Sequence, residues 1–340
     1  MVLDLAATSR NWALTPTGVA RVQDETPPGW EVVVVTAPTS SDGDGPPTAS
    51  EEARTAAAEA EAYFGFGFTA DLLAAAPRLR WVHSAAAGVG NVLKSGIVDT
   101  DIILTNSAGI HGPPIGEFVV AGLLHFMRGL DVAIAQQQRG EWSKVFFVAN
   151  DSPMRELSDS RVLIVGTGGL GGETARRLSA LGATCVGIRR RVELGAPPGF
   201  ASVAGLDAFD AELQRADALV LAAPLTSETS ELMTRARLEL LPPHAIIVNV
   251  ARGALIDEDA LADLLEAGRL RGAVLDVFRQ EPLATTSRLW QLRSALVVPH
   301  VSPVSPGRFW PRQLDLFLDN WRRYAAGEPL RNVVDKRAGY

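Results

Sequence analysis

Cysteine is almost absent from this sequence, because Cys185 is the single cysteine among 340 residues. One thiol cannot form an internal disulfide, so a secreted domain stapled by disulfides is excluded. Long hydrophobic runs are also missing, since the longest strongly apolar stretch, residues 118–127, has about half the length that a bilayer requires. The first ten residues lack the basic and apolar regions of a secretory signal. We therefore expect a cytoplasmic protein.

Basic residues are also fewer than acidic ones, 32 against 39, which gives a formal net charge of −7 at pH 7. This balance gives no general attraction for nucleic acid or an anionic membrane, and we expect neither as a partner. No spacing of His, Cys, Asp or Glu suggests a metal site, so none is expected. The composition is 47% hydrophobic and 21% charged, which is typical of globular proteins, and the length suggests about two domains.

Short apolar segments alternate with helical patterns along most of the chain. In the first part, residues 31–35, 79–85 and 101–106 are strand-like and are separated by alanine-rich segments. From Val162 onward the strands "VLIVG", "TCVGI", "ALVLAA", "AIIVNV", "AVLDV" and "LVVPH" alternate with helices, which predicts an α/β fold with a parallel sheet. One long helix near 116–138, apolar almost all round at its start, is expected to be buried between domains or subunits.

A glycine-rich turn, "VLIVGTGGLGG", follows the strand that begins at Val162. Its G-x-G-x-x-G spacing lets Gly166 turn tightly, Gly168 approach a pyrophosphate, and Gly171 pack helix against strand. The phosphates would bind at the helix N-terminus, along the backbone of Gly169 and Leu170. A plain turn between strand and helix in a fold without a nucleotide is the alternative.

Three arginines stand where most NAD sites carry one carboxylate, at the end of the second strand of this unit. A guanidinium at Arg189 or Arg190 would pair with the 2′-phosphate of NADP, which a carboxylate would repel. Arg191 has a weaker case. The sequence thus favours NADP over NAD as cofactor, while a solvated basic loop, with Glu193 bonding the ribose of NAD, remains the alternative.

Arg252, Glu281 and His300 each follow an apolar strand. Ligands of open α/β sheets bind beyond the carboxyl ends of the strands, so we expect these side chains at one cleft. A carboxylate favours the protonated form of a neighbouring imidazole, and a guanidinium can hold a substrate carboxylate. This set suits hydride transfer to a 2-keto acid, although each residue alone is a weak signal. His83 is a further candidate, for the cleft or for core packing.

The sequence resembles the D-isomer-specific 2-hydroxyacid dehydrogenases. The resemblance lies in "NVARGALIDEDALADLLEAGRLRGAVLDVFRQEPL", "LAAPLTSETSELM", "NSAGIHGPPIGEFVVAGLL" and "HSAAAGVGNV", and it covers most of residues 81–300. It implies that Arg252 binds the substrate, that Glu281 hydrogen-bonds the acid–base His300, and that Asp276 holds the nicotinamide carboxamide. It also assigns substrate contacts to Ala87, Gly88 and Val89, and cofactor contacts to Ala223, Pro224 and Ala251.

The resemblance further implies a Rossmann-type doubly wound sheet inserted into a smaller flavodoxin-like substrate domain. The dinucleotide-binding domain would span residues 109–301, and residues 1–108 and 302–340 would form the discontinuous substrate domain. The helix near 116–138 would form a homodimer interface. Gly90 and Gly116 depart from the residues usual in the family, which leaves the substrate open.

These features together predict a reductase that transfers a hydride from NADPH to a small 2-keto acid, or the reverse from a D-2-hydroxy acid. One alternative is a nucleotide-sensing regulatory protein on the same fold. Another is an NAD-dependent member of the family that acts on a different small anion.

Overall fold

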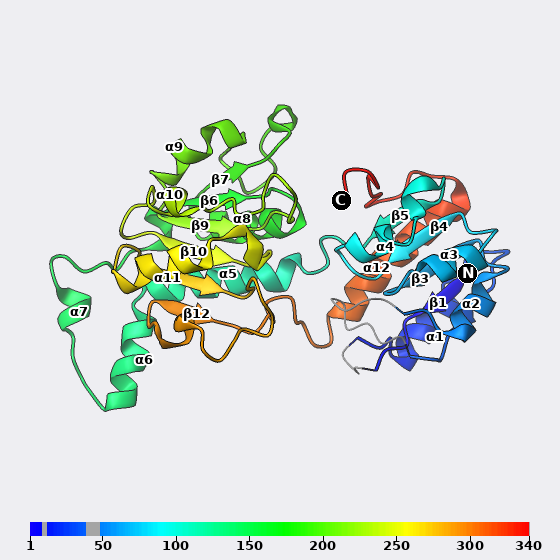
Figure 1. Ribbon diagram of the computed structural model, residues 1–340, viewed down its shortest axis with the longest axis horizontal. Helices are drawn as coiled ribbons and strands as arrows, with labels where there is room; N and C mark the ends of the chain where they lie inside the picture. The colour runs from blue at the N-terminus through cyan, green and yellow to red at the C-terminus, as the bar shows by residue number, and fades with distance from the viewer. Residues whose placement is uncertain (9–11, 39–47, 340) are drawn as a thin grey trace. The chain divides into compact units, whose positions relative to one another are not determined.

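The computed structural model describes residues 1–8, 12–38 and 48–339, and it divides into two compact units (Figure 1). Unit 1 comprises Met1–Ile110 and Ser305–Tyr340, and unit 2 comprises His111–Val304. Unit 2 is therefore an insertion in the sequence of unit 1, and its ends lie within a few residues of the domain boundaries expected from the sequence.

Unit 1 is built on a parallel sheet of five strands in the order β2-β1-β3-β4-β5. This is the flavodoxin-like order, in which the chain reverses direction across the sheet between β1 and β3. The elements are β1 (Val2–Asp4), α1 (Pro16–Asp24), β2 (Val33–Val34), α2 (Glu51–Ala57), β3 (Ala62–Gly65), α3 (Ala70–Ala75), β4 (Trp81–Ser84), α4 (Gly90–Leu93), β5 (Ile103–Asn106) and α12 (Phe309–Ala326).

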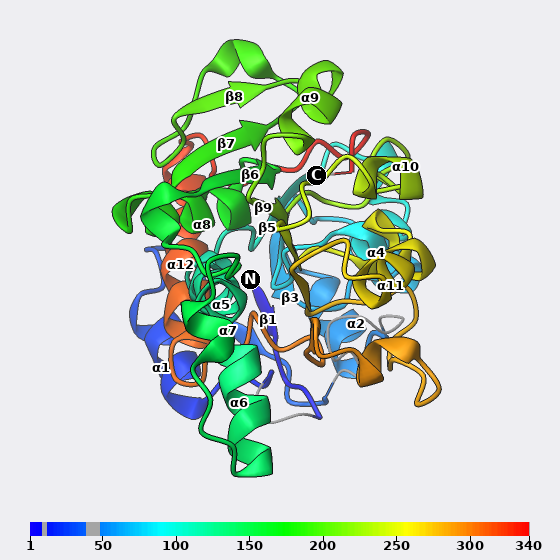
Figure 2. The same cartoon turned by 90° about the vertical axis from the view of Figure 1, so that its left-hand side faces the viewer.

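Helices cover both faces of this sheet because successive strand residues point to opposite sides. Val2 and Tyr63 pack with α2, α3 and α4, whereas Leu3 and Phe64 pack with α1 and α12. Figure 2 shows α1 and α12 on one side of the sheet and α2 and α4 on the other. The C-terminal helix α12 is thus a core element of unit 1.

His83 of β4 is fully buried against β5 and α12, in a network of hydrogen bonds between uncharged groups. The Trp81 Nε1–H donates to Thr105 Oγ1 at 2.9 Å, and Thr105 Oγ1 lies 2.7 Å from His83 Nδ1. Ser107 Oγ is 3.3 Å from His83 Nε2 and accepts from Gln313 Nε2 at 2.7 Å. Burial lowers the pKa of His83 to about 3, so the ring is neutral. His83 therefore packs in the core, the second of the two roles expected for it.

Unit 2 is built on a parallel sheet of seven strands in the order β12-β11-β10-β9-β6-β7-β8. This doubly wound arrangement confirms the α/β fold with parallel sheets predicted from the alternating pattern. The elements are α5 (Gly112–Met127), α6 (Leu130–Arg139), α7 (Val145–Val148), β6 (Arg161–Val165), α8 (Gly169–Ala180), β7 (Thr184–Ile188), β8 (Ser202–Ala204), α9 (Phe209–Leu213), β9 (Ala218–Leu221), α10 (Arg235–Leu238), β10 (Ile246–Asn249), η5 (Gly253–Leu255), α11 (Glu258–Glu266), β11 (Gly272–Leu275), η6 (Arg288–Gln291) and β12 (Ala295–Val297).

Two apolar layers sandwich this sheet, and its central strands are buried on both faces. Val162 and Ile164 of β6 face α5 and α8, whereas Leu163 and Val165 face the layer of α9, α10 and α11. Figure 2 shows α5 and α8 on one side of the sheet and α10 and α11 on the other. Cys185 of β7 lies in the first layer, where burial raises the pKa of its thiol to about 11.

The single helix expected near residues 116–138 is wrong, because α5 and α6 meet at an angle of 66°. Gly129 adopts a left-handed φ of 67° at the break, where an added Cβ would lie 3.0 Å from the rings of Phe146 and Phe147. In the described part of the chain, no single helix is long and apolar enough to cross a membrane, and only the bent pair α5–α6 meets those criteria of length and composition.

Asp4, at the end of β1, is a fully buried acid. The Tyr63 hydroxyl lies 2.6 Å from Asp4 Oδ2, to which it donates, and 2.6 Å from the carbonyl oxygen of Gly67. Among the described residues, the other carboxyl oxygen, Asp4 Oδ1, is buried without a hydrogen-bond partner. Burial raises the pKa of Asp4 to about 6, against the opposing hydrogen bond from Tyr63.

We predict that the Asp4→Asn substitution affects the stability of unit 1 more favourably at pH 8 than at pH 4. The folded-state pKa of Asp4 is about 6 against an ordinary value of 3.8. The contribution of protonated Asp4 to the free energy of unfolding is therefore fully present below its ordinary pKa of 3.8 and is lost as the pH rises through 6. Asparagine keeps an acceptor for the Tyr63 hydroxyl and does not titrate. The unfolding free energy of the variant minus that of wild type should rise by roughly 2.5 kcal/mol from pH 4 to pH 8.

Urea unfolding followed by tryptophan fluorescence measures this difference, because Trp12, Trp30, Trp81, Trp310 and Trp321 all belong to unit 1. Asp101→Asn, at an exposed position of the same unit, is the control and should leave the pH dependence unchanged. Equal pH dependence in wild type and Asp4→Asn would show that Asp4 ionises normally.

Candidate active site

The glycine turn lies between β6 and α8, where β6 is flanked by β9 and β7. Gly166 has a φ of 93°, and an added Cβ there would lie 2.9 Å from backbone atoms of Ala222 and Ala223. A Cβ on Gly171 would lie only 1.8 Å from the carbonyl oxygen of Gly166. Both glycines are therefore required by contacts within the protein, as the sequence spacing predicts.

Gly168 differs from the other two glycines because a Cβ there would meet no atom of the protein within 4 Å. It is the N-cap of α8, and no side chain caps this helix. The first N–H groups of α8, on Gly169 and Leu170, thus face an open approach at the positive end of the helix dipole. These residues fit a pyrophosphate held on backbone N–H groups.

The loops after β7 and β9 carry the other predicted cofactor residues. Arg189 donates from Nη1 to the carbonyl oxygen of Gly195 at 2.8 Å, and Arg190 Nη2 pairs with Glu228 at 2.8 Å. Ala223 is buried, and Pro224 beside it is exposed. The two guanidinium groups therefore stand at the end of β7, each with a partner within the protein.

His300 and Glu281 form a hydrogen-bonded pair beyond the ends of β12 and β11. His300 Nδ1 lies 2.8 Å from Glu281 Oε2, with the two side chains 27% and 35% exposed. The other carboxylate oxygen, Oε1, accepts from the backbone N–H of Phe278 at 2.9 Å. With Nδ1 bound to the carboxylate, Nε2 is the nitrogen that His300 can present to a substrate.

Asp276 anchors the backbone on both sides of His300. The His300 N–H donates to the Asp276 carbonyl at 2.9 Å, and the fully buried Asp276 carboxylate accepts from Val301 N–H at 2.8 Å and Ser302 N–H at 3.1 Å. These bonds hold His300 at a φ of 51°, a left-handed conformation that non-glycine residues rarely adopt. Asp276, the residue expected to hold the nicotinamide carboxamide, thus also fixes the loop that carries His300.

Arg252 follows β10, and its turn is held by Asn249. The Asn249 side chain accepts from Ala251 N–H at 3.1 Å and donates to the carbonyl of Arg252 at 3.0 Å. The Arg252 guanidinium is exposed and donates to the carbonyl of Ala251 at 2.7 Å. Within the described residues, no hydrogen bond or ion pair joins it to Glu281 or His300.

Gly253 nevertheless brings the turn after β10 against the segment that carries Glu281. An added Cβ on Gly253 would lie 1.9 Å from the carbonyl carbon of Phe278 and 2.3 Å from the backbone nitrogen of Arg279. Because β10, β11 and β12 are neighbours in one parallel sheet, Arg252, Glu281 and His300 all follow strand ends at the same edge.

The predicted substrate-binding residues Ala87, Gly88 and Val89 belong to unit 1, in the loop between β4 and α4. The Ala87 carbonyl accepts from Asn106 Nδ2 at 2.7 Å. Gly88 is exposed, whereas the Val89 side chain is buried in the core. In the described ranges of the chain, no group of three His, Cys, Asp or Glu side chains could hold a metal ion.

A glycine turn at the switch point of a doubly wound sheet, with a histidine–glutamate pair beyond other strands at the same edge, is typical of dinucleotide-binding oxidoreductases. Residues 120–302 match the family model described as D-isomer specific 2-hydroxyacid dehydrogenase, NAD binding domain. This match covers more than half of the chain. The protein belongs to the D-isomer specific 2-hydroxyacid dehydrogenase family.

Individual relatives agree with this assignment. A D-3-phosphoglycerate dehydrogenase of Mycobacterium bovis is 34% identical over 68% of this chain, and the match spans 42% of that longer protein. A D-isomer specific 2-hydroxyacid dehydrogenase from Xanthobacter autotrophicus, solved with NADPH, superposes with a TM-score of 0.75 at 29% identity and covers 95% of both chains. An NADPH-dependent glyoxylate/hydroxypyruvate reductase from Sinorhizobium meliloti gives a TM-score of 0.73 at 28% identity over 96% of this chain and 97% of its own.

Two glycines of the turn, Gly168 and Gly171, allow a paired test of the cofactor site. Gly168→Ala should fold with nearly unchanged thermal stability, because its Cβ meets no protein atom. The same Cβ would enter the approach to the helix N-terminus and weaken NAD(P)H binding by at least about tenfold. Gly171→Ala should instead lower the melting temperature strongly, because its Cβ overlaps the Gly166 carbonyl.

Thermal unfolding and fluorescence titration with NADPH and NADH measure the two effects. If Gly168→Ala bound both nucleotides as tightly as wild type, the turn would not be the pyrophosphate site.

Proposed function

We propose that this protein is an NADPH-preferring reductase of small 2-keto acids, working reversibly on the corresponding D-2-hydroxy acids. The His300–Glu281 pair, beyond the ends of β12 and β11 at the same edge of the sheet as the glycine turn, is the observation that carries this proposal. A nucleotide-binding fold without catalysis would have no use for an imidazole held by a carboxylate at this edge. The family membership supports the same chemistry.

The residues divide the work of the reaction. The bound nicotinamide nucleotide supplies the hydride. His300 delivers a proton from Nε2 to the carbonyl oxygen of the keto acid, and Glu281 on Nδ1 stabilises the charged ring before transfer. The Arg252 guanidinium binds the substrate carboxylate through a two-pronged hydrogen bond and polarises the carbonyl. In unit 1, the backbone N–H groups of Gly88 and Val89 would be available to a substrate carboxylate, with Ala87 beside them. In unit 2, Asp276 and Ala251 would contact the nicotinamide end of the cofactor.

The preference for NADPH rests on Arg189 and Arg190 at the end of β7. No carboxylate follows β7 directly, because Ile188 is succeeded by three arginines. Guanidinium groups there pair with a 2′-phosphate in charge-assisted hydrogen bonds. Two related structures from other organisms carry NADPH or NADP, which supports the same preference in this chain.

A homodimer is part of this proposal. In unit 2, α6 and α7 project from the sheet (Figure 1), and they expose Ile134, Val145 and Val148 at 47%, 75% and 70%. Arg271 holds the base of this projection through a paired hydrogen bond to Asp131 at 2.7 and 2.9 Å. A second copy would cover the apolar side chains, and sedimentation at the 36.2 kDa mass of one chain would contradict this.

The cytoplasmic location also stays a prediction.

The reaction is tested by following NADPH and NADH oxidation with glyoxylate, hydroxypyruvate, pyruvate and phenylpyruvate, and NAD(P)+ reduction with D-3-phosphoglycerate. We expect turnover of at least one 2-keto acid, faster with NADPH. His300→Asn should lower kcat by about a thousandfold or more while NADPH still binds, because the proton donor is lost. Asparagine is the appropriate replacement because it tolerates the left-handed backbone at residue 300.

An inactive wild-type protein that still binds NADPH would favour a nucleotide sensor. Oxidation of D-3-phosphoglycerate with NAD+ alone would favour the alternative of an NAD-dependent enzyme for another anion. Activity retained in His300→Asn would remove His300 from the mechanism.

The arginines provide a separate prediction for cofactor choice. Arg189→Ala and Arg190→Ala should each raise the KM for NADPH by about tenfold or more, the equivalent of one hydrogen bond to a charged group. The KM for NADH should change by less than about threefold, because NADH has no 2′-phosphate. Arg191→Ala is the matched control and should leave both values near wild type. Equal losses for NADH and NADPH would contradict the assignment.

A further inference from the structure

In the segment that carries Glu281, residues 277–282, two adjacent backbone amides bind carboxylates, one within the segment and one outside it. The Phe278 N–H donates to Glu281 Oε1 at 2.9 Å, while Glu281 Oε2 contacts His300 Nδ1 at 2.8 Å. The carboxylate that orients His300 is therefore itself oriented by the backbone at Phe278. Any movement of that backbone moves the carboxylate.

The next amide, that of Arg279, donates to the side chain of Glu258. Glu258 is the first residue of α11 and follows the N-cap Asp257. Its carboxylate is half-buried, and burial raises its pKa, while the hydrogen bond from Arg279 opposes this shift. Desolvation of a carboxylate costs free energy, and the bond to the Arg279 amide offsets part of that cost.

Two further contacts restrict the same peptide unit. Gly253 packs so closely that a Cβ would lie 1.9 Å from the Phe278 carbonyl carbon. The Arg279 side chain pairs with Glu231, whose backbone N–H donates to the Ala254 carbonyl at 2.8 Å. The Phe278–Arg279 peptide thus lies between η5 on one side and α11 on the other.

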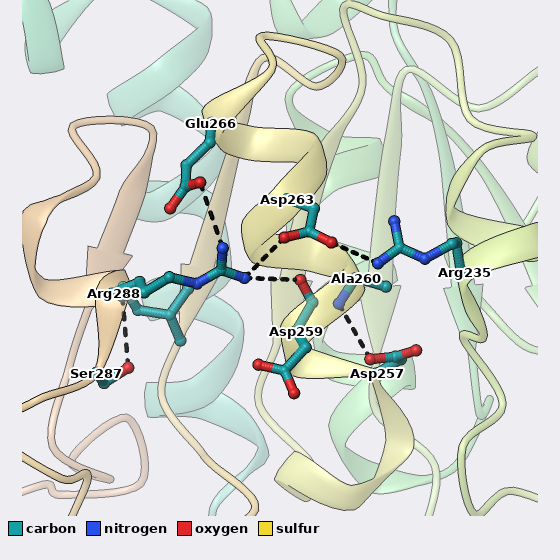
Figure 3. A network of polar contacts seen from close by, with 9 residues as sticks. Arg235, Asp257, Asp259, Ala260, Asp263, Glu266, Ser287 and Arg288 are labelled. Atoms are coloured by element: carbon teal, nitrogen blue, oxygen red, sulfur yellow. Dashed lines mark hydrogen bonds and ion pairs between the residues drawn. The ribbon is translucent and has the colours of Figure 1, made fainter.

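The helix that supplies Glu258 is itself fixed by a network of charges (Figure 3). Asp257 accepts from Ala260 N–H at 3.0 Å. Arg288 of η6 donates to Asp263 at 2.8 Å and to the backbone carbonyl of Asp259 at 3.1 Å, and Arg235 pairs with the other Asp263 oxygen. Several charges joined in this way hold α11 better than one exposed pair would. The helix therefore forms a rigid support for the segment that carries Glu281.

We propose that Glu258 is a positioning residue for the reaction. It fixes the Arg279 amide, the adjoining Phe278 amide places the Glu281 carboxylate, and that carboxylate places His300. This inference deepens the proposed function, since it assigns to α11 the alignment of the His300–Glu281 pair. Only its kinetic test rests on the proposed function, because the other measurements need no turnover.

Three variants test it. Glu258→Ala removes the acceptor of the Arg279 amide, Glu258→Gln keeps a carbonyl oxygen there, and Asp259→Ala removes a neighbouring charge from the same helix turn. Asp259→Ala leaves the backbone bond to Arg288 in place, because that bond uses the main-chain carbonyl. Glu258→Ala should lower kcat by roughly tenfold to a hundredfold with little change in either KM, because misalignment affects the chemical step. Glu258→Gln should recover most of the rate, and Asp259→Ala should match wild type.

Two measurements do not require turnover. Hydrogen exchange in the peptide 277–282 should be faster in Glu258→Ala by about tenfold or more and unchanged in Asp259→Ala. The imidazole NMR signals of His300, assigned among five histidines by comparison with His300→Asn, should shift in Glu258→Ala and return toward wild type in Glu258→Gln.

The outcomes separate this inference from the proposed function. If wild type turns over no substrate but exchange and the His300 signals change as described, the proposed function fails and the positioning by Glu258 stands. Unchanged exchange and unchanged His300 signals in Glu258→Ala overturn the positioning role, whether or not the enzyme is active. A wild-type kcat in Glu258→Ala overturns it as well, even when exchange is faster.

Discussion

The active-site edge of unit 2 depends on backbone packed directly against backbone. At Gly171 and at Gly253, an added Cβ would come within 2 Å of another main-chain atom, 1.8 Å in the first case and 1.9 Å in the second. The first contact closes the turn between β6 and α8, and the second presses the turn after β10 onto the segment that carries Glu281. Only glycine allows either approach. The glycine turn and the placement of the segment that carries Glu281 thus each depend on contacts between main-chain atoms.

Side-chain oxygens that accept from backbone amides complete this framework. Asn249, Asp276, Glu281 and Glu258 each bind the N–H of a loop that follows a parallel strand or lies beside one. Loops at strand ends have amide groups without partners in the sheet, and these oxygens satisfy them without adding a regular element. In the proposed mechanism, two of the four, Asp276 and Glu281, also take part in the chemistry. Fixing the loops before the ligands bind removes part of the ordering cost from the reaction.

The sequence was sufficient to predict the parallel α/β fold, because buried strands and glycine spacing are local signals. It predicted one helix where α5 and α6 bend at Gly129, because the apolar pattern continues across the left-handed glycine that breaks the helix. The strands β1, β3 and β8 were not predicted, because segments of three or four residues show no clear periodicity. Glu258 gave no catalytic signal, as an acidic residue in a first helical turn is ordinary. Its contact with Arg279 joins residues 21 positions apart and exists only in the folded chain.

The left-handed backbone at residue 300 restricts which acid this fold can use. Among side chains that accept a φ near 51°, asparagine, aspartate and histidine are the most frequent after glycine. Of these, only imidazole ordinarily gains and loses a proton close to neutrality. A lysine or tyrosine at the same position would pay the conformational free-energy cost of the left-handed backbone, and its pKa would also have to shift toward neutrality. The geometry at the end of β12 thus favours histidine before any substrate is considered.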